Sequence, residues 1–482
     1  MESLSETQWD LVIEGTGLKH SLLALALSRS NKKILHVDNN EYYGDDEAAF
    51  SLQEIDAWVK RSLSQNSTTS FSNASAAYDS ALKEKLTFSR AYNLTLSPQI
   101  IYTRSPLLSA LVSSKVYKQL EFQAVGSWFL YDDAALKRLP SGREDIFQDD
   151  SIDNRAKRSL MKFLKFVVDY ENQVDVWQDK AEMGLSQFLA NDFKLPQNLQ
   201  ILIGALTLSL DTLEGTKVGY ALPRIQRHLT SIGIFGPGFG AVVPKWGGGA
   251  EIAQVACRAG AVGGGVYVLG TGIQDEKCIE DDGTTTHEVH LSNDEKVKTR
   301  YITRINKDAP PAAIRVAKTM AIVSSPLGTL FTSSVEGSPT SAVSVIVFPA
   351  RTISTSDFTQ DHPVYIMAHS SETGECPAGQ CILYATTLLP ESFTTQTGKF
   401  LLEEVISKFL KTTEGDGGQV LYSVYYEQQG TEDKLDLAFN DQVLKDVEEE
   451  WKRVSDEDEE SLFMVFEERN GMDDDDDDGA EY

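Results

Sequence analysis

The feature that most constrains the fold lies near the start of the chain, where a short apolar run ends in a glycine-containing turn. Residues 11–13 predict a buried strand, residues 18–30 a helix, and residues 33–37 a second strand that ends in Asp38. Gly15 and Gly17 stand where a dinucleotide-binding fold needs a tight turn and a close backbone approach. The order strand, turn, helix, strand predicts an α/β fold.

Two residues in this opening argue against a bound cofactor. The third glycine of the dinucleotide fingerprint is replaced by His20, whose ring is bulky where helix and strand should pack closely. Glu14 places a carboxylate at the mouth of the turn, where it would repel a pyrophosphate. Asp38 has the spacing of a ribose-binding acid. The sequence therefore predicts a vestigial turn (Gly15, Gly17, Asp38) with no cofactor; a flavin or nicotinamide site is the less favoured alternative.

The charge of the chain is strongly negative and uneven. The formal net charge is −28, and residues 446–482 hold 18 acidic and 3 basic residues, ending in the six aspartates Asp473 to Asp478. Because such a dense run of like charges cannot collapse, we expect a solvated, flexible end; a docking strip for a basic partner is the alternative. The acidity argues against nucleic acid as a partner.

Neither the N-terminus nor the cysteines indicate secretion or metal binding. The first ten residues are polar, and no apolar run reaches the roughly 20 residues of a membrane span, so we expect a cytoplasmic protein. Four cysteines over this length make no disulfide framework, and Cys376 and Cys381 lack companions for a zinc site. His287 and His290 are interpreted as residues at a loop-to-strand junction. No metal site, nucleophile–base pair or catalytic residue is predicted.

Composition and periodicity divide the chain into four segments. Residues 1–138 and 233–445 are expected to form one larger α/β domain with mixed sheets, interrupted by an all-helical domain at 139–232 and followed by an acidic region at 446–482. Within the insert, 154–170 predicts an amphipathic helix. Residues 62–77 predict a loop, and 233–249, with seven glycines and two prolines, a flexible connection. Further strands are predicted at 266–269, 342–348, 364–368, 381–389 and 420–426, and a helix at 401–410.

A second motif lies at residues 247–269, where a glycine-rich loop leads into a predicted helix from about residue 250, a glycine break and a strand. Glu251, Gln254 and Arg258 share one face of that helix. Glu251 and Arg258 are separated by about 10 Å along the axis, which we expect to be too far for a direct ion pair. The two charges suit a large, flat partner; ordinary solvated charges are the alternative.

Several segments together resemble one protein family. GTG at 15–17, KKILHVDNNEYYG at 32–44, RAYNL at 90–94, VGSWFLY at 125–131 and the Glu251–Arg258 helix follow in family order. The chain thereby resembles Rab escort proteins and Rab GDP-dissociation inhibitors. The resemblance implies a flavoprotein-like fold without flavin and a platform for GDP-bound Rab GTPases. That platform would hold Tyr43, Glu251 and Arg258, flanked by Val266 and Val268, and Trp246 would replace an aromatic residue of the family's mobile loop.

Within the family, two features favour the escort branch. IEGTG at 13–17 and the segments 435–451 and 462–466 resemble escort proteins, although the large insertion of some escort proteins is missing. The resemblance then implies a non-catalytic accessory component of geranylgeranyl transferase type II. Its partners would be Rab GTPases, the transferase heterodimer, the geranylgeranyl lipid on Rab and, transiently, membranes. A recycling inhibitor is the alternative, and a flavin-dependent oxidoreductase the remote one.

The helical insert carries apolar residues that allow two interpretations. A prenyl carrier needs a groove between apolar helices, because a C20 chain gains on the order of 10 kcal/mol on leaving water. The candidates are Leu160, Phe163, Leu164, Leu185 and Phe188. The alternative is that these residues simply form the core of the insert.

Overall fold

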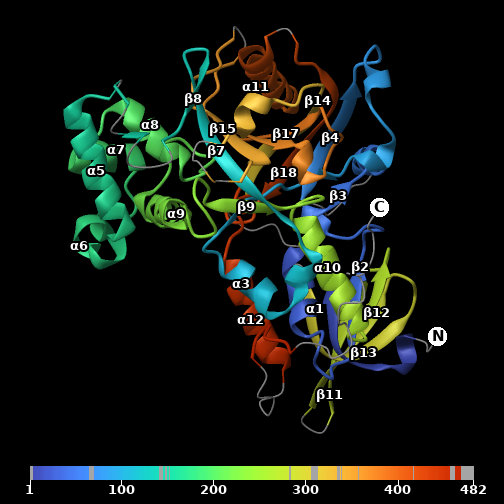
Figure 1. Cartoon of the computed structure of the whole chain (residues 1–482). Coiled ribbons are helices and arrows are strands. Elements are labelled where there is room, and N and C mark those ends of the chain that lie inside the picture. The colour runs from blue at the N-terminus through green and yellow to red at the C-terminus, as the bar shows by residue number, and fades with distance from the viewer. Residues whose placement is uncertain are drawn as a thin grey trace, which may run out of the picture.

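The computed structural model describes residues 4–64, 70–140, 145–146, 149–150, 152–281, 284–304, 313–333, 337, 339–355, 358–415, 417–455 and 462–467. Two sheets dominate the described residues (Figure 1). The smaller sheet, at the lower right of Figure 1, has six strands in the order β10 (Val266–Leu269), β2 (Ile34–Asp38), β1 (Gln8–Glu14), β13 (Lys296–Arg304), β12 (Thr284–Leu291) and β11 (Ile273–Asp281).

The larger sheet has ten strands and fills the upper part of Figure 1. Its order is β4 (Phe71–Tyr78), β18 (Val420–Gly430), β14 (Ile314–Val323), β17 (Cys381–Leu388), β16 (Val364–Ser370), β15 (Val343–Phe348), β7 (Phe122–Asp132), β9 (Ala241–Pro244) and β6 (Ile101–Tyr102), with β8 (Ala135–Arg138) paired to β7. A separate two-stranded ladder joins β3 (Ala49–Phe50) and β5 (Leu94–Thr95).

The described helices lie around these sheets (Figure 1). They are α1 (Leu18–Ala26), α2 (Leu52–Ser64), α3 (Pro106–Ser113), α5 (Asn154–Val168), α6 (Val174–Trp177), α7 (Leu185–Phe193), α8 (Gln197–Ala205), α9 (Val218–Ser231), α10 (Gly249–Val262), α11 (Thr395–Glu414) and α12 (Gln442–Val454). Short 3₁₀ helices are η1 (Leu4–Glu6), η2 (Asp45–Glu47), η3 (Lys83–Lys85), η4 (Ser89–Ala91), η5 (Val116–Gln119), η6 (Tyr170–Asn172), η7 (Gln178–Lys180), η8 (Gly328–Phe331) and η9 (Ser371–Thr373).

The predicted β-α-β opening is confirmed as the centre of the smaller sheet. β1 pairs in parallel with both β2 and β13, and β10 pairs in parallel with β2. Leu11 and Ile13 point toward the cluster that contains α1 and α10, while Val12 points to the opposite face. The alternation of side chains along β1 therefore fixes which face of the sheet the helices cover.

Two predictions about the irregular segments are wrong. The Ser-rich stretch 62–77 was expected to be a loop, but 71–78 is β4, held by β18; residues 65–69 of the stretch lie outside the described residues. The stretch 233–249, expected to be a flexible connection, contains β9, which pairs with β7 and β6. Small polar residues and glycine are weak strand formers, but pairing with a neighbouring strand overrides that preference. Besides β4 and β9, the strands of the two sheets without a counterpart among the predicted strands are β6, β7, β8, β11, β12, β13 and β14.

The helical insert has an aromatic core. The predicted helix 154–170 is confirmed as α5, which Asp153 caps by accepting hydrogen bonds from the amides of residues 155 and 156. Phe163 packs against Phe193, and Phe166 against Phe188 and Phe193. The groove candidates lie in this core: Leu160, Phe163, Leu185 and Phe188 are fully buried, and Leu164 is half-buried. In this structure these residues fill the core of the insert and do not line an open groove.

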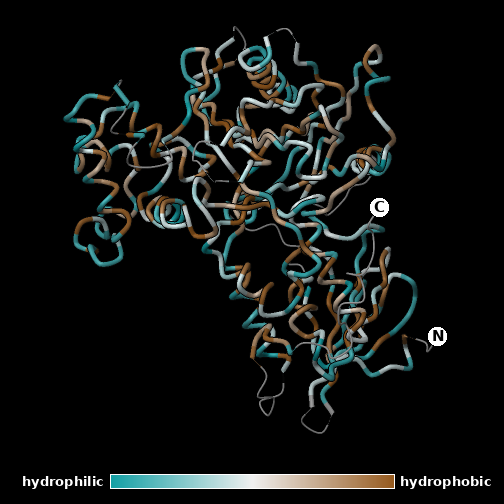
Figure 2. The backbone as a smooth tube through the Cα atoms, in the orientation of Figure 1, coloured by the Kyte–Doolittle hydropathy of each residue, from teal (hydrophilic) through white to brown (hydrophobic). Residues whose placement is uncertain are grey.

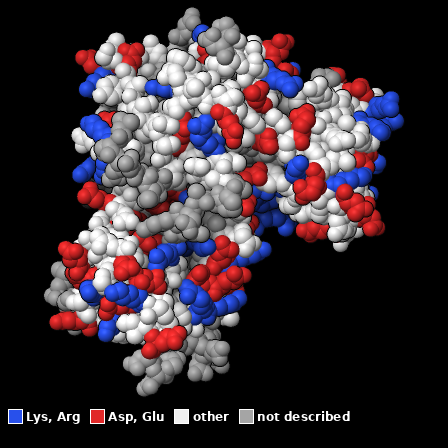
Figure 3. Space-filling model, turned by 180° about the vertical axis from the view of Figure 1, so that it is seen from behind, with Lys and Arg blue, Asp and Glu red and all other residues white. Residues whose placement is uncertain are grey.

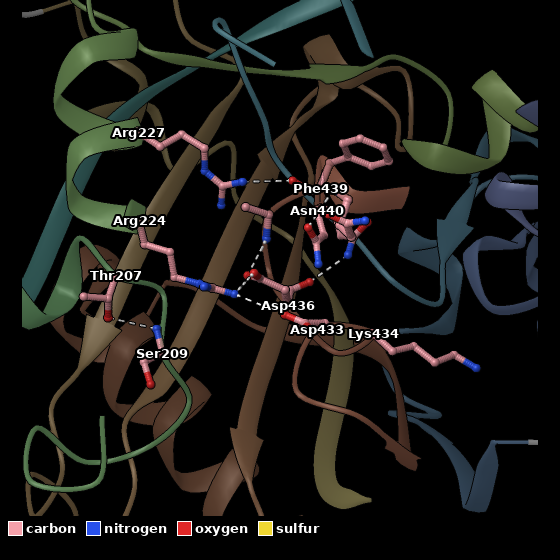
Figure 4. A network of polar contacts seen from close by, with 12 residues as sticks. Thr207, Ser209, Arg224, Arg227, Asp433, Lys434, Asp436, Phe439 and Asn440 are labelled. Carbon is pink, nitrogen blue, oxygen red and sulfur yellow. Dashed lines mark hydrogen bonds and ion pairs between the residues drawn. The ribbon is translucent and has the colours of Figure 1, made fainter. Parts of the chain in front are cut away.

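A polar clasp joins the insert to the segment before α12 (Figure 4). Arg224 of α9 donates to a carboxylate oxygen of Asp436 at 2.8 Å, and Arg227 donates to the carbonyl of Phe439 at 3.2 Å. The other Asp436 oxygen accepts from the amide of Ala438. The Asp436 side chain is almost fully buried, so the clasp is a desolvated ion pair with hydrogen bonds on both carboxylate oxygens. The predicted domain boundaries at 138/139 and 232/233 stay a prediction.

Hydropathy follows the layers of the molecule. In Figure 2 the hydrophobic segments gather along the strands and on the inward faces of the helices, and hydrophilic segments occupy the outer loops. Within the described residues, none of the helices combines the length and the apolar character needed to cross a membrane. The aspartates 473–478 and most of the predicted acidic region lie outside the described residues.

Candidate binding platform beside a carboxylate-filled turn

The turn after β1 is held by Asp38. Gly15 has a φ of 102°, a conformation that favours glycine. The buried Thr16 donates twice to one carboxylate oxygen of Asp38, from its amide at 2.8 Å and from its hydroxyl at 2.6 Å. The Thr16 hydroxyl oxygen in turn accepts from the amide of Gly44. Burial raises the pKa of Asp38. The acid predicted at the ribose position is thus engaged inside the protein.

The N-terminus of α1 is occupied by a side chain of the protein itself. The amide of Leu18, which would face a bound pyrophosphate, donates to a carboxylate oxygen of Glu47 at 3.0 Å. A Cβ placed on Gly17 would lie 3.2 Å from that same oxygen and 3.5 Å from the Asp45 Cβ. Burial, followed by the charge of Asp46, raises the pKa of Glu47 to about 7.

These contacts do not fit a dinucleotide. A phosphate at the α1 N-terminus would have to displace Glu47 and would then face Asp45, whose own pKa is raised by burial and by neighbouring carboxylates. Glu14, the first acid that the sequence singled out, accepts a hydrogen bond from the amide of Ile273. We term Asp38, Asp45, Asp46 and Glu47 the acid cluster. Sequence analysis missed three of its four members, although 45–47 forms an unbroken acidic run directly after the glycine of YYG.

His20, at the third fingerprint position, is accommodated in the interior. Its side chain is buried, and burial, reinforced by His36, lowers its pKa to about 3. Burial likewise lowers the pKa of His36 to about 4. The Nε2 of His36 donates a hydrogen bond to the carbonyl of Gly15. Both rings are therefore neutral at physiological pH. His287 and His290, expected near a loop, lie within β12 beside Glu276 and Glu288.

Tyr43 connects the turn to α10 and β10. Its hydroxyl shares a hydrogen bond with the Ser21 hydroxyl of α1 at 2.8 Å. Its ring centroid lies 6.3 Å from that of Tyr267 on β10. Burial raises the pKa of Tyr43, with a further contribution from the Cys257 thiol of α10. The ring is half-buried, so it can present only part of its surface to a partner.

Glu251 and Arg258 form a direct ion pair, so the prediction that they are too far apart is wrong. An Arg258 guanidinium nitrogen lies 2.9 Å from a Glu251 carboxylate oxygen. The two backbone positions are indeed separated by about 10 Å along the axis of the helix. The pair forms because helical side chains lean toward the N-terminus and the Arg side chain is long enough to span the gap. The Glu251 side chain is 15% exposed and that of Arg258 is 52% exposed, so the pair offers mainly the guanidinium to solvent.

Val266 and Val268 lie on the other face of the smaller sheet. In the parallel register they stand beside Leu35 and Val37, and Val268 packs against the cluster that contains them, opposite α1 and α10. Tyr267, between the two valines, points toward His36, with ring centroids 5.0 Å apart. The structure therefore brings together Tyr43, Glu251 and Arg258 around α10, and separates Val266 and Val268 from them across the edge strand β10.

Gly260 and Leu269 also shape this surface and were not predicted. Gly260 of α10 allows the Tyr267 hydroxyl to approach, since a Cβ there would lie 2.1 Å from that oxygen. Val262 and Leu269, next to the predicted valines, are exposed. Trp246, which the resemblance assigns to a mobile loop, follows β9 by two residues, and its amide donates to the carbonyl of Thr373. Among the described residues, no group of three His, Cys, Asp or Glu could hold a metal ion.

Comparisons with known proteins agree on a family. Residues 5–415 match the family model described as GDP dissociation inhibitor. A protein of Saccharomyces cerevisiae named "Rab proteins geranylgeranyltransferase component A" is 33% identical over 387 residues, which cover 78% of this chain and 61% of the relative. The chain thus spans about 60% of the length of the first curated relatives it matches.

Two solved structures share the fold. The crystal structure of a Rab GDI from Plasmodium falciparum is 18% identical and covers 93% of this chain and 98% of its own, with a TM-score of 0.63. An oxidoreductase from Methanosarcina mazei is 12% identical, covers 88% of each chain and has a TM-score of 0.52. At these identities the likeness concerns the architecture, which is the mixed α/β, flavoprotein-like class predicted from the sequence.

Proposed function

This chain belongs to the GDP dissociation inhibitor family, and we propose that within the family it acts as a Rab escort protein. It binds GDP-bound Rab GTPases, presents them to geranylgeranyl transferase type II and delivers the prenylated Rabs to membranes. The observation that carries the proposal is the 33% identity with a protein named as component A of the Rab transferase. The resemblance of IEGTG at 13–17 and of 435–451, which includes most of α12, to escort proteins supports the same branch.

We place the Rab-binding surface on the platform around α10. Arg258 contributes an exposed guanidinium whose position is fixed by Glu251, and Tyr43 contributes a half-buried ring next to Cys257 of the same helix. A fixed cation costs less entropy on binding than a free one. Val266 and Val268 join the contact only for a partner that wraps around β10, because β10 is the outer strand of its sheet.

We propose that the protein is an accessory component and carries no cofactor. Support for the second statement comes from Glu47, which binds the Leu18 amide where a pyrophosphate would sit, and from the negative charge of the acid cluster. The helical insert would contact the transferase and the geranylgeranyl lipid, and the protein would work in the cytoplasm with transient membrane contact. A purified protein with a flavin absorption band in the visible range would contradict the cofactor statement.

The deciding experiment is a prenylation assay with transferase, geranylgeranyl diphosphate and a GDP-loaded Rab, with and without the full chain. An escort protein makes lipid transfer depend on its presence. A parallel assay uses the Arg258→Ala variant. A higher concentration of this variant than of the wild type should be needed for the same rate of lipid transfer. Lipid transfer at the same rate without the protein would contradict the proposal.

A Rab GDP-dissociation inhibitor is the second candidate. The family model bears that description. This candidate predicts that the protein extracts prenylated Rabs from membranes while leaving the transferase reaction unchanged. Running the extraction assay and the prenylation assay on the same protein preparation separates the two functions.

A further inference from the structure

A groove runs along the flank of α11. This helix lies at the top of the ten-stranded sheet, away from α10 (Figure 1). The volume of the groove is about 450 Å³. The floor is formed by Thr319 and Ala321 of β14 and Ser423 of β18, and the wall by Ile406 and Leu410 of α11. We call this the α11 groove. Its volume lies within the range of about 300–1,000 Å³ that is typical of small-molecule sites.

The groove follows from a change in side-chain size along the helix. Near the start of α11, Gly398 lets the helix approach the sheet, because a Cβ there would lie 2.8 Å from Leu389 Cδ2 and from the Tyr425 hydroxyl. Farther along, Ala321 and Ser423 stand directly opposite each other in the register of β14 and β18. Two small neighbours on adjacent strands leave the space beside the helix unfilled.

Thr319 supplies a buried polar group of the groove, which the hydroxyl-bearing Ser407 and Ser423 also line. Its side chain is 4% exposed, and its hydroxyl makes no hydrogen bond within the described residues. A buried hydroxyl without a partner costs free energy, so the position favours a ligand that offers an oxygen acceptor. The remaining inner lining from Ala321, Ile406 and Leu410 is apolar.

The charges around the groove indicate an uncharged ligand. Glu403 and Lys411, both exposed, stand at the rim with opposite signs, and neither sign predominates. Thr319 has no cationic group beside it among the groove-lining residues that could hold a carboxylate at depth. Burying an unpaired anion there would be costly.

We propose that the α11 groove binds a neutral, mainly apolar small molecule with one hydrogen-bonding oxygen, of the chemical class of a fatty alcohol. The apolar chain packs against Ile406 and Leu410, and the Thr319 hydroxyl donates to the oxygen. This site does not depend on the proposed function, because it shares no residue with the platform around α10.

The test uses prodan, a neutral naphthyl ketone whose fluorescence shifts on leaving water, and its displacement by 1-decanol from the full-length protein. Wild type should bind prodan saturably and release it to decanol. Ser423→Leu, which fills the floor at a half-buried position, should weaken binding at least about 10-fold. Thr319→Val keeps the side-chain shape but lacks the hydroxyl, and should weaken binding about 3–10-fold.

A matched control lies in a second cavity of about 140 Å³ between the α8–α9 connection and the ends of β15 and β16, where Ala350→Leu fills space in the same way. Ala350→Leu should bind prodan like the wild type. Circular dichroism and thermal unfolding check each variant, and if Ser423→Leu does not fold, Thr319→Val decides. The proposal is overturned by absence of saturable binding, by wild-type affinity in both groove variants, or by loss of binding in Ala350→Leu.

Discussion

Single carboxylates decide what the first turn can do. Asp38 and Glu47 take up the Thr16 and Leu18 amides that a dinucleotide fold directs at its ligand. Both acids are held in surroundings that penalise their charged forms, as the raised pKa of Glu47 shows. The turn therefore keeps its geometry while its anion site is filled by the chain.

Glu47→Gln should alter the pH dependence of stability. The folded pKa of about 7 exceeds the ordinary value of 4.5, so the folded protein binds more protons than the unfolded one between these values, and stability falls as pH rises through that window. The amide oxygen of Gln can still accept from Leu18 but carries no charge. We expect the variant to be up to about 3 kcal/mol more stable than wild type at pH 8 and equal to it near pH 4.

Urea unfolding at several pH values measures this difference. Glu448→Gln, in an exposed pair with Lys452 on α12, is the control and should change stability by less than about 1 kcal/mol. A Glu47→Gln variant that is less stable than wild type at pH 8 would show that the Glu47 carboxylate is net stabilising there.

Arg258→Ala should separate binding from stability. Half of the Arg258 side chain is exposed, and a surface ion pair contributes about 0–1 kcal/mol, so unfolding should change little. Affinity for a GDP-loaded Rab should fall by about 1–3 kcal/mol, as expected for an interface anchor. Calorimetric titration measures the affinity, with Lys452→Ala on α12 as the control. Unchanged affinity in both Arg258→Ala and Tyr43→Ala would remove the platform assignment.

At the scale of elements, contacts between α10 and β10 set the shape of the platform. Gly260→Ala would place a Cβ 2.1 Å from the Tyr267 hydroxyl and 3.3 Å from the ring carbon that bears it. We expect a destabilisation of about 1–3 kcal/mol, which Tyr267→Phe partly reverses because the clash is chiefly with the hydroxyl. Gly328→Ala, with nothing within 4 Å of the added Cβ, is the control. Additive effects of the two substitutions would contradict the contact.

The elements that the sequence predicted well are those with strong local patterns. The opening strands, α5 and the apolar strands β15 to β18 combine periodicity or β-branched runs with clear boundaries. β4 was missed because its residues FSNASAAY are small and polar, and its pairing with β18 depends on residues about 350 positions away. The Glu251–Arg258 pair was missed because side-chain reach, unlike backbone spacing, is not visible in the sequence.

The acid cluster shows a similar limit at the site. Asp38 could be found from its distance after the turn, but Glu47 reaches the α1 N-terminus only through the path of η2. Likewise, Val266 and Val268 were correctly placed on a strand, yet the face they occupy depends on the parallel register with β2. Local patterns thus identify candidate residues, and tertiary contacts decide which of them share a surface.

On the scale of the whole molecule, one hydrophobic cluster spans the helical insert and the ten-stranded sheet. It contains Phe163 and Phe188 of the insert together with Val345 and Tyr365 of the sheet. The clasp between Arg224 and Asp436 adds a polar link between the same parts. Figure 3 shows acidic and basic side chains interspersed over the face of the molecule seen from behind, with neither sign confined to one part of it.

Because the core is shared, heating should unfold the insert and the larger sheet in a single transition. Arg224→Met leaves the buried Asp436 without its cation and should cost about 3–5 kcal/mol while keeping one transition. Lys137→Met, which breaks an exposed pair with Asp132, is the control and should cost less than about 1 kcal/mol. Two calorimetric peaks in the wild type would show that the insert unfolds independently.

The hydrogen bond between Glu47 and the N-terminus of α1 has a consequence for how the protein matures in a cell. A fold that waits for a diffusible prosthetic group gains stability in proportion to the logarithm of that group's concentration. Here the stand-in for the group is covalently part of the polypeptide, through Glu47, and is present at a fixed one-to-one ratio. On the proposal that no cofactor binds, maturation at this position would follow translation alone, independent of vitamin status or metabolic state.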